Sequence, residues 1–350
     1  MKRPSFLENL FSGYFALVMA TGIVSIATHL LKMELLAYSL FKINQVCYLV
    51  LVVLTLLRLI FFPRQIFLDL TDHNRGPGFF TFVAGSCVLG IQFLFFTSSR
   101  GIPLGLWLGG FLAWFIVMYV FFTAATVRSP KPTLENGLNG AWLLAVVATQ
   151  SLSILGTLLT KYVFLSHTTE VLFLSLCMFL LGCMIYLLII SVIFQRLMFV
   201  NVEAKTLTPP YWINMGAVAI TTLAGATLVA NAAAWVFLQQ IEPFLKGFTL
   251  FFWATCSWWI PLLFILGVWR HLYKKVALTY DPQYWGMVFP LGMYVTCTYR
   301  LAEIFKFDFL QVIPRYFVFI PIVVWAIAFG GMVHQIVKSS RLAFFNRNEN

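Results

Sequence analysis

The chain has 350 residues, of which 61% are hydrophobic and only 10% are charged, and its mean hydropathy is +0.90. Soluble domains contain about 45–50% apolar and about 25% charged residues. A water-soluble fold with this composition would expose large apolar patches. The composition therefore predicts a polytopic membrane protein, and it excludes a soluble enzyme, a disulfide-stapled secreted scaffold and a disordered chain.

Apolar runs long enough to cross a bilayer, about 20 residues each, occur ten times along the chain. We predict an all-α polytopic membrane protein with a single transmembrane domain over residues 1–350. The ten transmembrane helices are expected at about 11–31, 38–62, 79–99, 102–127, 140–160, 170–197, 211–231, 245–269, 284–305 and 315–337. The first run follows Lys2 and Arg3 as in a signal peptide, but it lacks a clear cleavage site, so we expect it to remain in the mature protein.

The basic residues predict the orientation of the chain. Of the 23 Lys and Arg residues, fifteen lie on the side that holds both termini, seven lie on the opposite side, and Arg300 lies within a span. Positive loops mark the cytoplasmic side, so we expect a multi-pass plasma (inner) membrane protein with both termini in the cytoplasm. The net charge of +11 is spread over short loops, so it does not indicate a nucleic-acid partner.

Signatures of catalysis, cofactors and metals are missing from the sequence. There is no Walker loop, G-x-G-x-x-G, G-x-S-x-G or H-E-x-x-H motif, and the six cysteines lie in apolar segments without a C-x-x-C pair. Apart from Glu170 at the first position of the sixth span, Glu303 is the only carboxylate within a predicted span, whereas a proton-driven pump normally has several. We therefore expect no enzymatic activity, no cofactor and no metal site.

The odd-numbered and even-numbered predicted helices differ in composition. The odd ones carry small and polar residues, whereas the even ones are mostly Leu, Ile, Val, Phe and Trp. Polar side chains in a membrane face protein or water, so the pattern suggests five helical hairpins with the odd helices inside. The alternative is that small residues only pack the bundle. The candidate pore-lining residues are Gly22, Ser25, Ser86, Gly90, Gln150, Ser153, Thr222, Gly225, Gly292 and Thr296.

Arg300 and Glu303 are the ionisable residues within the predicted ninth helix. They are three positions apart, so they share one helix face and can pair. Ionisable residues inside a span are common functional markers. Two interpretations remain open, a structural ion pair and a role in attracting anions.

Phe289 and Pro290 form a more specific feature of the same helix. Pro290 removes a backbone donor and is expected to kink the helix about one turn inside the membrane, and Gly286 and Gly292 leave space beside the Phe289 ring. A bulky apolar side chain that faces a narrow pore blocks ions by excluding water. Phe289 is therefore a candidate gate, although it could also be a core residue in a chain with 37 phenylalanines.

Three motifs in order carry a resemblance to a known family. They are Gly13 through Ser25, Asn139 through Leu144, and Trp285 through Glu303 with its Phe-Pro step. The chain resembles the tellurite-resistance/C4-dicarboxylate transporter family, which includes plant slow anion channels and fungal malate and sulfite transporters. The resemblance implies five hairpins around a central pore formed by the odd helices, homotrimers with one pore per subunit, and a pore-occluding role for Phe289.

Together these features predict membrane transport of small anions, either inorganic anions or C4-dicarboxylates such as malate, through a central pore occluded at Phe289. The expected partners are the anionic substrate, the lipid bilayer and two further copies of the chain. One alternative is a proton-coupled C4-dicarboxylate secondary transporter. A remoter alternative is a non-conducting membrane receptor or scaffold.

Overall fold

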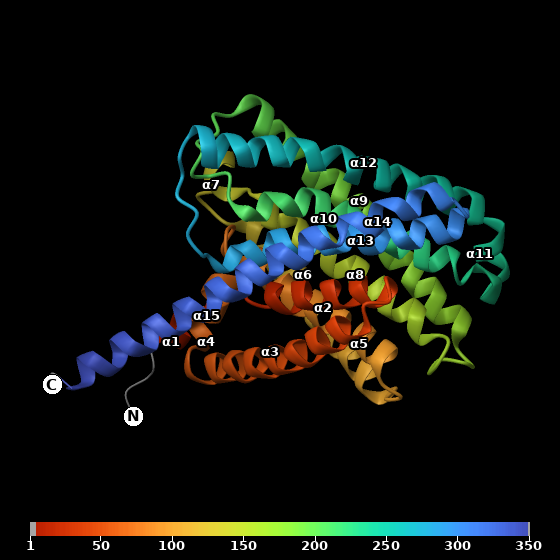
Figure 1. Ribbon diagram of the computed structural model, residues 1–350, viewed down its shortest axis with the longest axis horizontal. Coiled ribbons are helices and arrows are strands. Elements are labelled where there is room, and N and C mark those ends of the chain that lie inside the picture. The colour runs from red at the N-terminus through yellow and green to blue at the C-terminus, as the bar shows by residue number, and fades with distance from the viewer. Residues whose placement is uncertain (1–4, 349–350) are drawn as a thin grey trace.

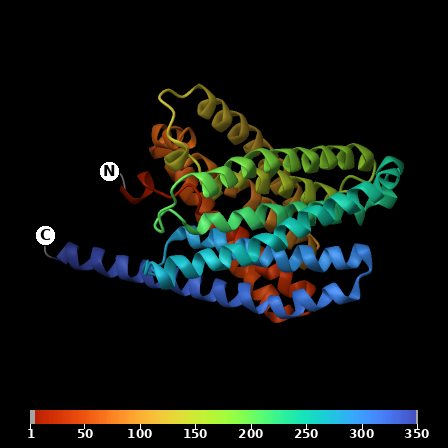
Figure 2. The ribbon, with the colours of Figure 1, turned by 90° about the horizontal axis from the view of Figure 1, so that it is seen from above.

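The computed structural model describes the backbone of residues 5–348 and the side chains of residues 6–339. Within that range the chain is helical and contains no β-strand, as the all-α prediction requires. The long helices lie side by side in one bundle, and the end of the last helix projects beyond it (Figures 1 and 2). Lys2, Arg3 and the side chains of Arg341 and Arg347, which contribute to the predicted orientation, lie outside the described residues.

Five helices form a closed inner ring. Each one contacts the next, and the fifth contacts the first. The last four are each preceded by a 3₁₀ turn, which tightens the start of the helix. The ring helices are α2 (Ala16–Leu30), α5 (Phe80–Phe96, after η1 Gly76–Phe79), α8 (Leu144–Leu159, after η2 Gly140–Leu143), α10 (Ile213–Val229, after η3 Pro209–Trp212) and α13 (Trp285–Phe305, after η6 Pro282–Tyr284).

Each ring helix packs against an outer helix that follows it in the chain. In the ring segment Pro209–Val229, 94% of the most apolar 18-residue stretch is buried, whereas in the outer helix Glu34–Phe61 the share is 17%. Ring helices and outer helices therefore lie in different environments. The outer faces carry many exposed Leu, Ile, Val and Phe side chains, as lipid-facing helices do. The outer helices are α3 (Glu34–Phe61), α6 (Gly101–Val127), α9 (Thr168–Phe199), α12 (Glu242–Val268) and α15 (Phe319–Asn348, after α14 Val312–Phe317).

Short elements connect these helices. They are α1 (Ser5–Glu8), α4 (Pro63–Leu70), α7 (Leu134–Gly137), η4 (Ala232–Ala234), α11 (Val236–Gln240), η5 (Trp269–Tyr273) and η7 (Asp308–Gln311).

All ten segments predicted as spans coincide with helices, but some boundaries differ. The first helix begins at Ala16 instead of residue 11, and the last is divided at Val318 and extends to Asn348. The division is consistent with Pro321, which has no N–H to donate to the preceding turn. Among the described residues, eight helical segments are long and apolar enough to cross a membrane. α2 is shorter, and polar residues including Arg300 and Glu303 lower the hydropathy of α13, so ten crossings remain a prediction.

Pro290 lies inside α13, and Gly216 of α10 makes room for it. A Cβ atom built on Gly216 would lie 2.6 Å from Cγ of Pro290. That separation is well below ordinary van der Waals contact, and the proline ring is rigid. α10 and α13 can therefore approach this closely only if residue 216 has no side chain.

We expect Gly216→Ala to destabilise the protein by about 1–3 kcal/mol, because the new methyl group overpacks the contact with Pro290. Gly247→Ala is the matched control. Gly247 also lies within a long helix, but its built Cβ meets no atom within 4 Å. Thermal unfolding in detergent measures both variants. Equal unfolding temperatures for the two would show that the close approach of α10 and α13 does not restrict residue 216.

Candidate functional site

The interior of the ring contains two cavities. One, of about 470 Å³, lies at the N-terminal ends of the ring helices and includes Ala16, Leu144 and Ile213 in its wall. We call it the N-side cavity. The other, of about 320 Å³, lies nearer their C-terminal ends and includes Leu30 and Leu158. We call it the C-side cavity. All five ring helices contribute to each cavity, so both lie on the axis of the ring.

A thin apolar layer, the barrier, separates the cavities. On α13, Phe289 lines the N-side cavity and Met293 lines the C-side cavity. On α2, Met19 and Ile23 do the same. Both pairs are four residues apart, which is about 6 Å along a helix at about 1.5 Å per residue. The path is therefore interrupted over about one helical turn.

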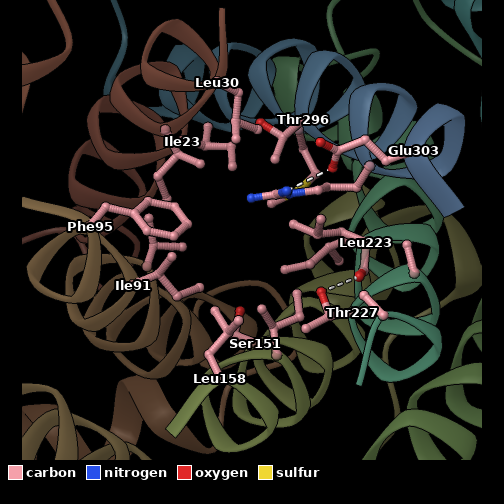
Figure 3. Close-up of a pocket in the computed structure, with 18 of the residues that line it drawn as sticks. Ile23, Leu30, Ile91, Phe95, Ser151, Leu158, Leu223, Thr227, Thr296 and Glu303 are labelled. Carbon is pink, nitrogen blue, oxygen red and sulfur yellow. Dashed lines mark hydrogen bonds and ion pairs between the residues drawn. The ribbon is translucent and has the colours of Figure 1, made fainter. Parts of the chain in front are cut away.

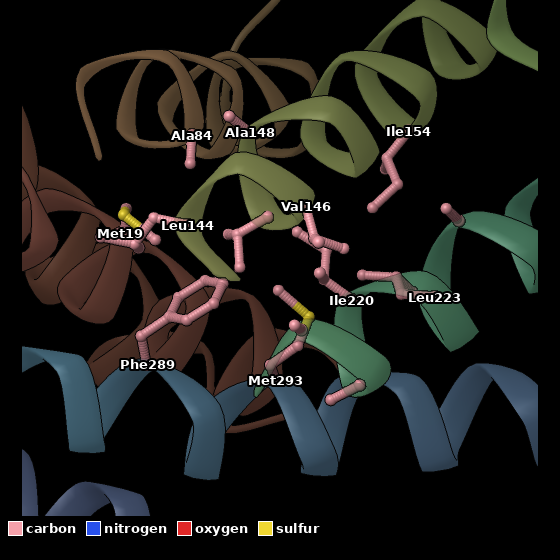
Figure 4. Packing of buried hydrophobic residues seen from close by; sticks show 14 of the residues in the cluster. Met19, Ala84, Leu144, Val146, Ala148, Ile154, Ile220, Leu223, Phe289 and Met293 are labelled. Atoms are coloured by element: carbon pink, nitrogen blue, oxygen red, sulfur yellow. The ribbon is translucent and has the colours of Figure 1, made fainter. Parts of the chain in front are cut away.

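Three ring helices place an alanine at the level of the barrier. They are Ala84, Ala148 and Ala217. On its own helix, each alanine is three or four positions after a residue that lines the N-side cavity and three or four positions before one that lines the C-side cavity, so it lies on the same helix face as both. All three belong to one buried cluster with Phe289, which is only 1% exposed. Figure 4 shows the Phe289 ring extending from α13 toward the opposite helices and Leu144. The small side chains leave space that this one large ring fills.

The start of α13 is fixed beside the N-side cavity. Trp285, which lines the cavity, donates its indole N–H to the hydroxyl of Tyr280 in the preceding loop (3.2 Å). Burial raises the pKa of Tyr280 to about 12, so this hydroxyl stays protonated at physiological pH.

The C-side cavity contains the Arg300–Glu303 pair. Nη1 of Arg300 lies 2.7 Å from Oε2 of Glu303, and both side chains are partly exposed. Both residues line the cavity, and Figure 3 shows Glu303 with Ile23, Phe95 and Leu223 among the side chains around it. Lys161 also lines the cavity. Its charged lining residues are thus two cations and one carboxylate.

The N-side cavity is more polar and also carries an excess of positive charge. Its charged lining residues are Arg75, Arg196, Lys205 and Glu135. The N-terminal ends of all five ring helices surround it, and each contributes a partial positive charge. The cavity therefore favours anions over cations.

Of the ten residues predicted to line the pore, Thr296 alone belongs to the wall of either cavity. Four of the others attach ring helices to outer helices. Ser25 Oγ donates to the carbonyl of Ala37 (2.7 Å), Ser153 Oγ donates to that of Ser175 (2.7 Å), Gln150 Nε2 donates to that of Phe179 (3.0 Å), and Ser86 Oγ shares a hydrogen bond with the hydroxyl of Tyr48 (2.9 Å).

The remaining five lie at helix contacts or within a helix. The glycines permit close packing, because a Cβ atom at each would meet a neighbouring side chain. The neighbours are Val88 and Asn44 at Gly22, Leu155 at Gly90, Thr249 at Gly225 and Ile23 at Gly292, while Thr222 donates to the carbonyl of Val218 in its own helix.

The cavity walls contain residues that the search for polar positions missed. Ile23, Val88, Ile220 and Met293 line the C-side cavity. Arg196, which the sequence analysis only counted among the fifteen basic residues on the side of the termini, lines the N-side cavity. The described residues contain no group of three or more His, Cys, Asp or Glu side chains that could hold a metal ion.

The arrangement defines a helical membrane protein with a closed ring around an interrupted axial path. The family model described as SLAC1, voltage-dependent anion channel, matches residues 9–333. The chain therefore belongs to the SLAC1 family, which confirms the resemblance seen in the sequence, and membership supports anion transport as its general function.

Relatives in other organisms agree with this class. An uncharacterized transporter of Methanocaldococcus jannaschii is 27% identical over 333 residues, which cover 92% of this chain and 92% of the relative. A second one from that organism is 25% identical over 88% of this chain and 90% of its own length. An uncharacterized membrane protein of Mycobacterium tuberculosis is 36% identical over 155 residues, covering 44% of this chain and 78% of the relative.

Cysteine labelling tests the observed lining on a single helix. Leu158 and Ser153 both lie on α8, but only Leu158 lines a cavity. We expect Leu158→Cys to react with a charged, membrane-impermeant thiol reagent roughly tenfold faster than Ser153→Cys, because a buried thiol is inert. The native cysteines set the background, which is measured on the wild-type chain. Faster labelling of Ser153→Cys would place the cavity wall on the opposite face of α8.

Proposed function

We propose that the protein conducts small anions along the axis of its ring and that Phe289 closes this path. The observation that carries the proposal is the alignment of two cavities with excess cationic charge inside one ring, separated by about one helical turn. Cations at each mouth concentrate anions. A dry apolar constriction then stops them, because an ion does not enter a segment that excludes water.

The barrier contains no titratable side chain at the positions that define it. Met19, Ile23, Phe289 and Met293 are apolar, as are the three alanines at their level. A proton-coupled carrier would need a group that gains and loses a proton along the path. The composition of the barrier therefore favours passive conduction of anions over proton-coupled transport of C4-dicarboxylates.

The charged groups indicate weak selectivity among anions. Arg300 already has a carboxylate partner in Glu303, and the C-side cavity has no pair of free arginines to hold both ends of a dicarboxylate. We propose small inorganic anions as substrates, with C4-dicarboxylates such as malate as a second class to be tested. The N-side cavity would face the cytoplasm of a plasma membrane, and the chain would assemble as a homotrimer with one path in each subunit.

Phe289→Ala is the decisive variant. We expect it to raise chloride or nitrate flux into liposomes by roughly tenfold or more, because loss of the ring joins the two cavities and allows water into the barrier. The matched control is Phe252→Ala. Phe252 is also fully buried, but it lies on α12 and lines neither cavity.

Equal flux through folded Phe289→Ala and Phe252→Ala proteins would contradict the gate. Malate uptake that requires a proton gradient would instead favour the carrier. Binding of a ligand or partner without flux of any anion would favour a receptor.

Glu303→Gln tests the charge of the C-side cavity, measured in the Phe289→Ala background. For an anion about 10 Å from Glu303, removing its negative charge changes the energy by about 0.4 kcal/mol in water, or roughly twofold in local concentration. We expect a roughly twofold rise in flux at low ionic strength. In 1 M salt we expect no rise, because the Debye length is then about 3 Å and the charge at residue 303 is screened from the anion.

Glu242→Gln is the control for this effect. Glu242 forms a similarly exposed pair with Lys246 (2.7 Å) but lines neither cavity. If both variants changed the flux equally, a general surface effect would replace the role of the C-side cavity.

A further inference from the structure

Arg196 extends from the outer helix α9 into the wall of the N-side cavity. Its residue surface is only 4% exposed. Nη2 donates a hydrogen bond to the backbone carbonyl of Glu135 (2.8 Å). Within the described part of the chain, Nε and Nη1 are buried and have no hydrogen-bond partner. A buried guanidinium with two unused nitrogens is costly unless a counter-ion or water satisfies it.

Arg58 is a buried arginine that does have a carboxylate partner, although its Nε, like that of Arg196, has no hydrogen-bond partner. Arg58 is 2% exposed, and its Nη2 lies 2.5 Å from Oδ2 of Asp69, which is 3% exposed. The same nitrogen donates to the carbonyl of Glu8 (2.8 Å). Arg58 lines neither of the two axial cavities. The purely structural arginine therefore has a carboxylate partner.

No carboxylate of the described residues pairs with Arg196. The exposed side chain of Glu135 attracts the guanidinium electrostatically, but only its backbone carbonyl is hydrogen-bonded to it. Asp69 is already shared between Arg58 and Arg75 (3.3 Å to the latter). Lys205, the remaining charged residue of the cavity wall, adds positive charge. The described residues therefore leave Nε and Nη1 of Arg196 available to a group from solution.

Tyr211 holds the guanidinium in place. The Arg196 Cζ atom lies 5.7 Å from the centroid of the buried Tyr211 ring, a separation typical of a cation–π contact. The side chain is thus oriented by Tyr211 and by the carbonyl of Glu135, and its two other nitrogens stay unused. A fixed guanidinium with free N–H groups binds halides and the oxygens of nitrate or carboxylate.

We infer that Arg196 is the anion-binding residue of the N-side cavity, where a small anion is held as its counter-ion. The bound group is a small inorganic anion such as a halide or a nitrate, and the larger gluconate ion serves as the non-binding reference in the test below. The inference rests on the proposed function and deepens it, because it assigns the residue at which an anion waits on the N-side.

Binding is tested without transport by thermal unfolding of the full chain in detergent. Sodium nitrate is titrated against sodium gluconate at constant ionic strength, so that general screening stays the same. An anion that binds the folded state stabilises it by mass action. We expect a saturable rise in unfolding temperature for the wild type and no such rise for Arg196→Gln.

The control variant is Arg64→Gln. Arg64 is exposed and lines neither cavity, and the substitution removes the same charge. Its nitrate titration should match that of the wild type. Arg196→Lys keeps the charge but loses the planar donor group, so its apparent Kd for nitrate should rise by about tenfold. This variant decides the question if Arg196→Gln does not fold.

Two outcomes would overturn the inference. One is a wild-type chain that nitrate does not stabilise beyond gluconate, which would mean that water occupies the site. The other is an Arg196→Gln chain whose unfolding temperature rises with nitrate as it does in the wild type. If only Arg196→Lys folds, an apparent Kd for nitrate equal to that of the wild type has the same meaning. Flux through Phe289→Ala with an unchanged titration in the Arg196 variants would reject this site and keep the proposed function. Loss of the nitrate response in the Arg196 variants, together with no anion flux through Phe289→Ala, would support the site and reject the proposed function.

Discussion

Hydrogen bonds between ring helices and outer helices determine the rest of this structure. Lipid tails are as apolar as leucine, so the hydrophobic effect does not drive helices together in a bilayer, and polar side chains must find partners within the protein. Here the ring helices direct several serine, glutamine and threonine side chains outward, and tryptophans from the outer helices donate inward. Trp114 bonds to Thr149 (2.8 Å), Trp253 to Thr298 (3.0 Å) and Trp325 to Thr21 (2.9 Å).

This outward use of polar groups leaves the barrier between the two cavities apolar. The ring axis is then closed by the size of side chains and not by specific bonds. Alanines on three helices leave a space, and the Phe289 ring fills it. Dispersion contacts are weak individually and have no fixed direction. A side chain held only by such contacts can move when its helix moves, whereas the bonded contacts around it keep the ring intact.

The sequence predicted the architecture well, because apolar length and the odd–even contrast follow directly from the bilayer. It also predicted the contact between Arg300 and Glu303, which the structure contains, whereas the gate role of Phe289 and Pro290 stays a prediction. It failed for the pore lining. Ser25, Gln150 and Ser153 are polar and lie on the ring helices, so they looked suited to face water, but composition does not tell which side of a helix faces the axis. Arg196 was not recognised, because its charge near a helix end is equally typical of an ordinary cytoplasmic residue.

All five ring helices share one direction, and this makes the axis electrically asymmetric. Their N-terminal partial positive charges surround one mouth, and their C-terminal partial negative charges, about half an elementary charge each, surround the other. Without compensation the second mouth would repel the ions that the first attracts. Arg300 and Lys161 lie at that second mouth, where their charges offset the helix ends. If the path conducts as proposed, any asymmetry that these two charges leave uncompensated would make the current depend on the direction of the driving voltage.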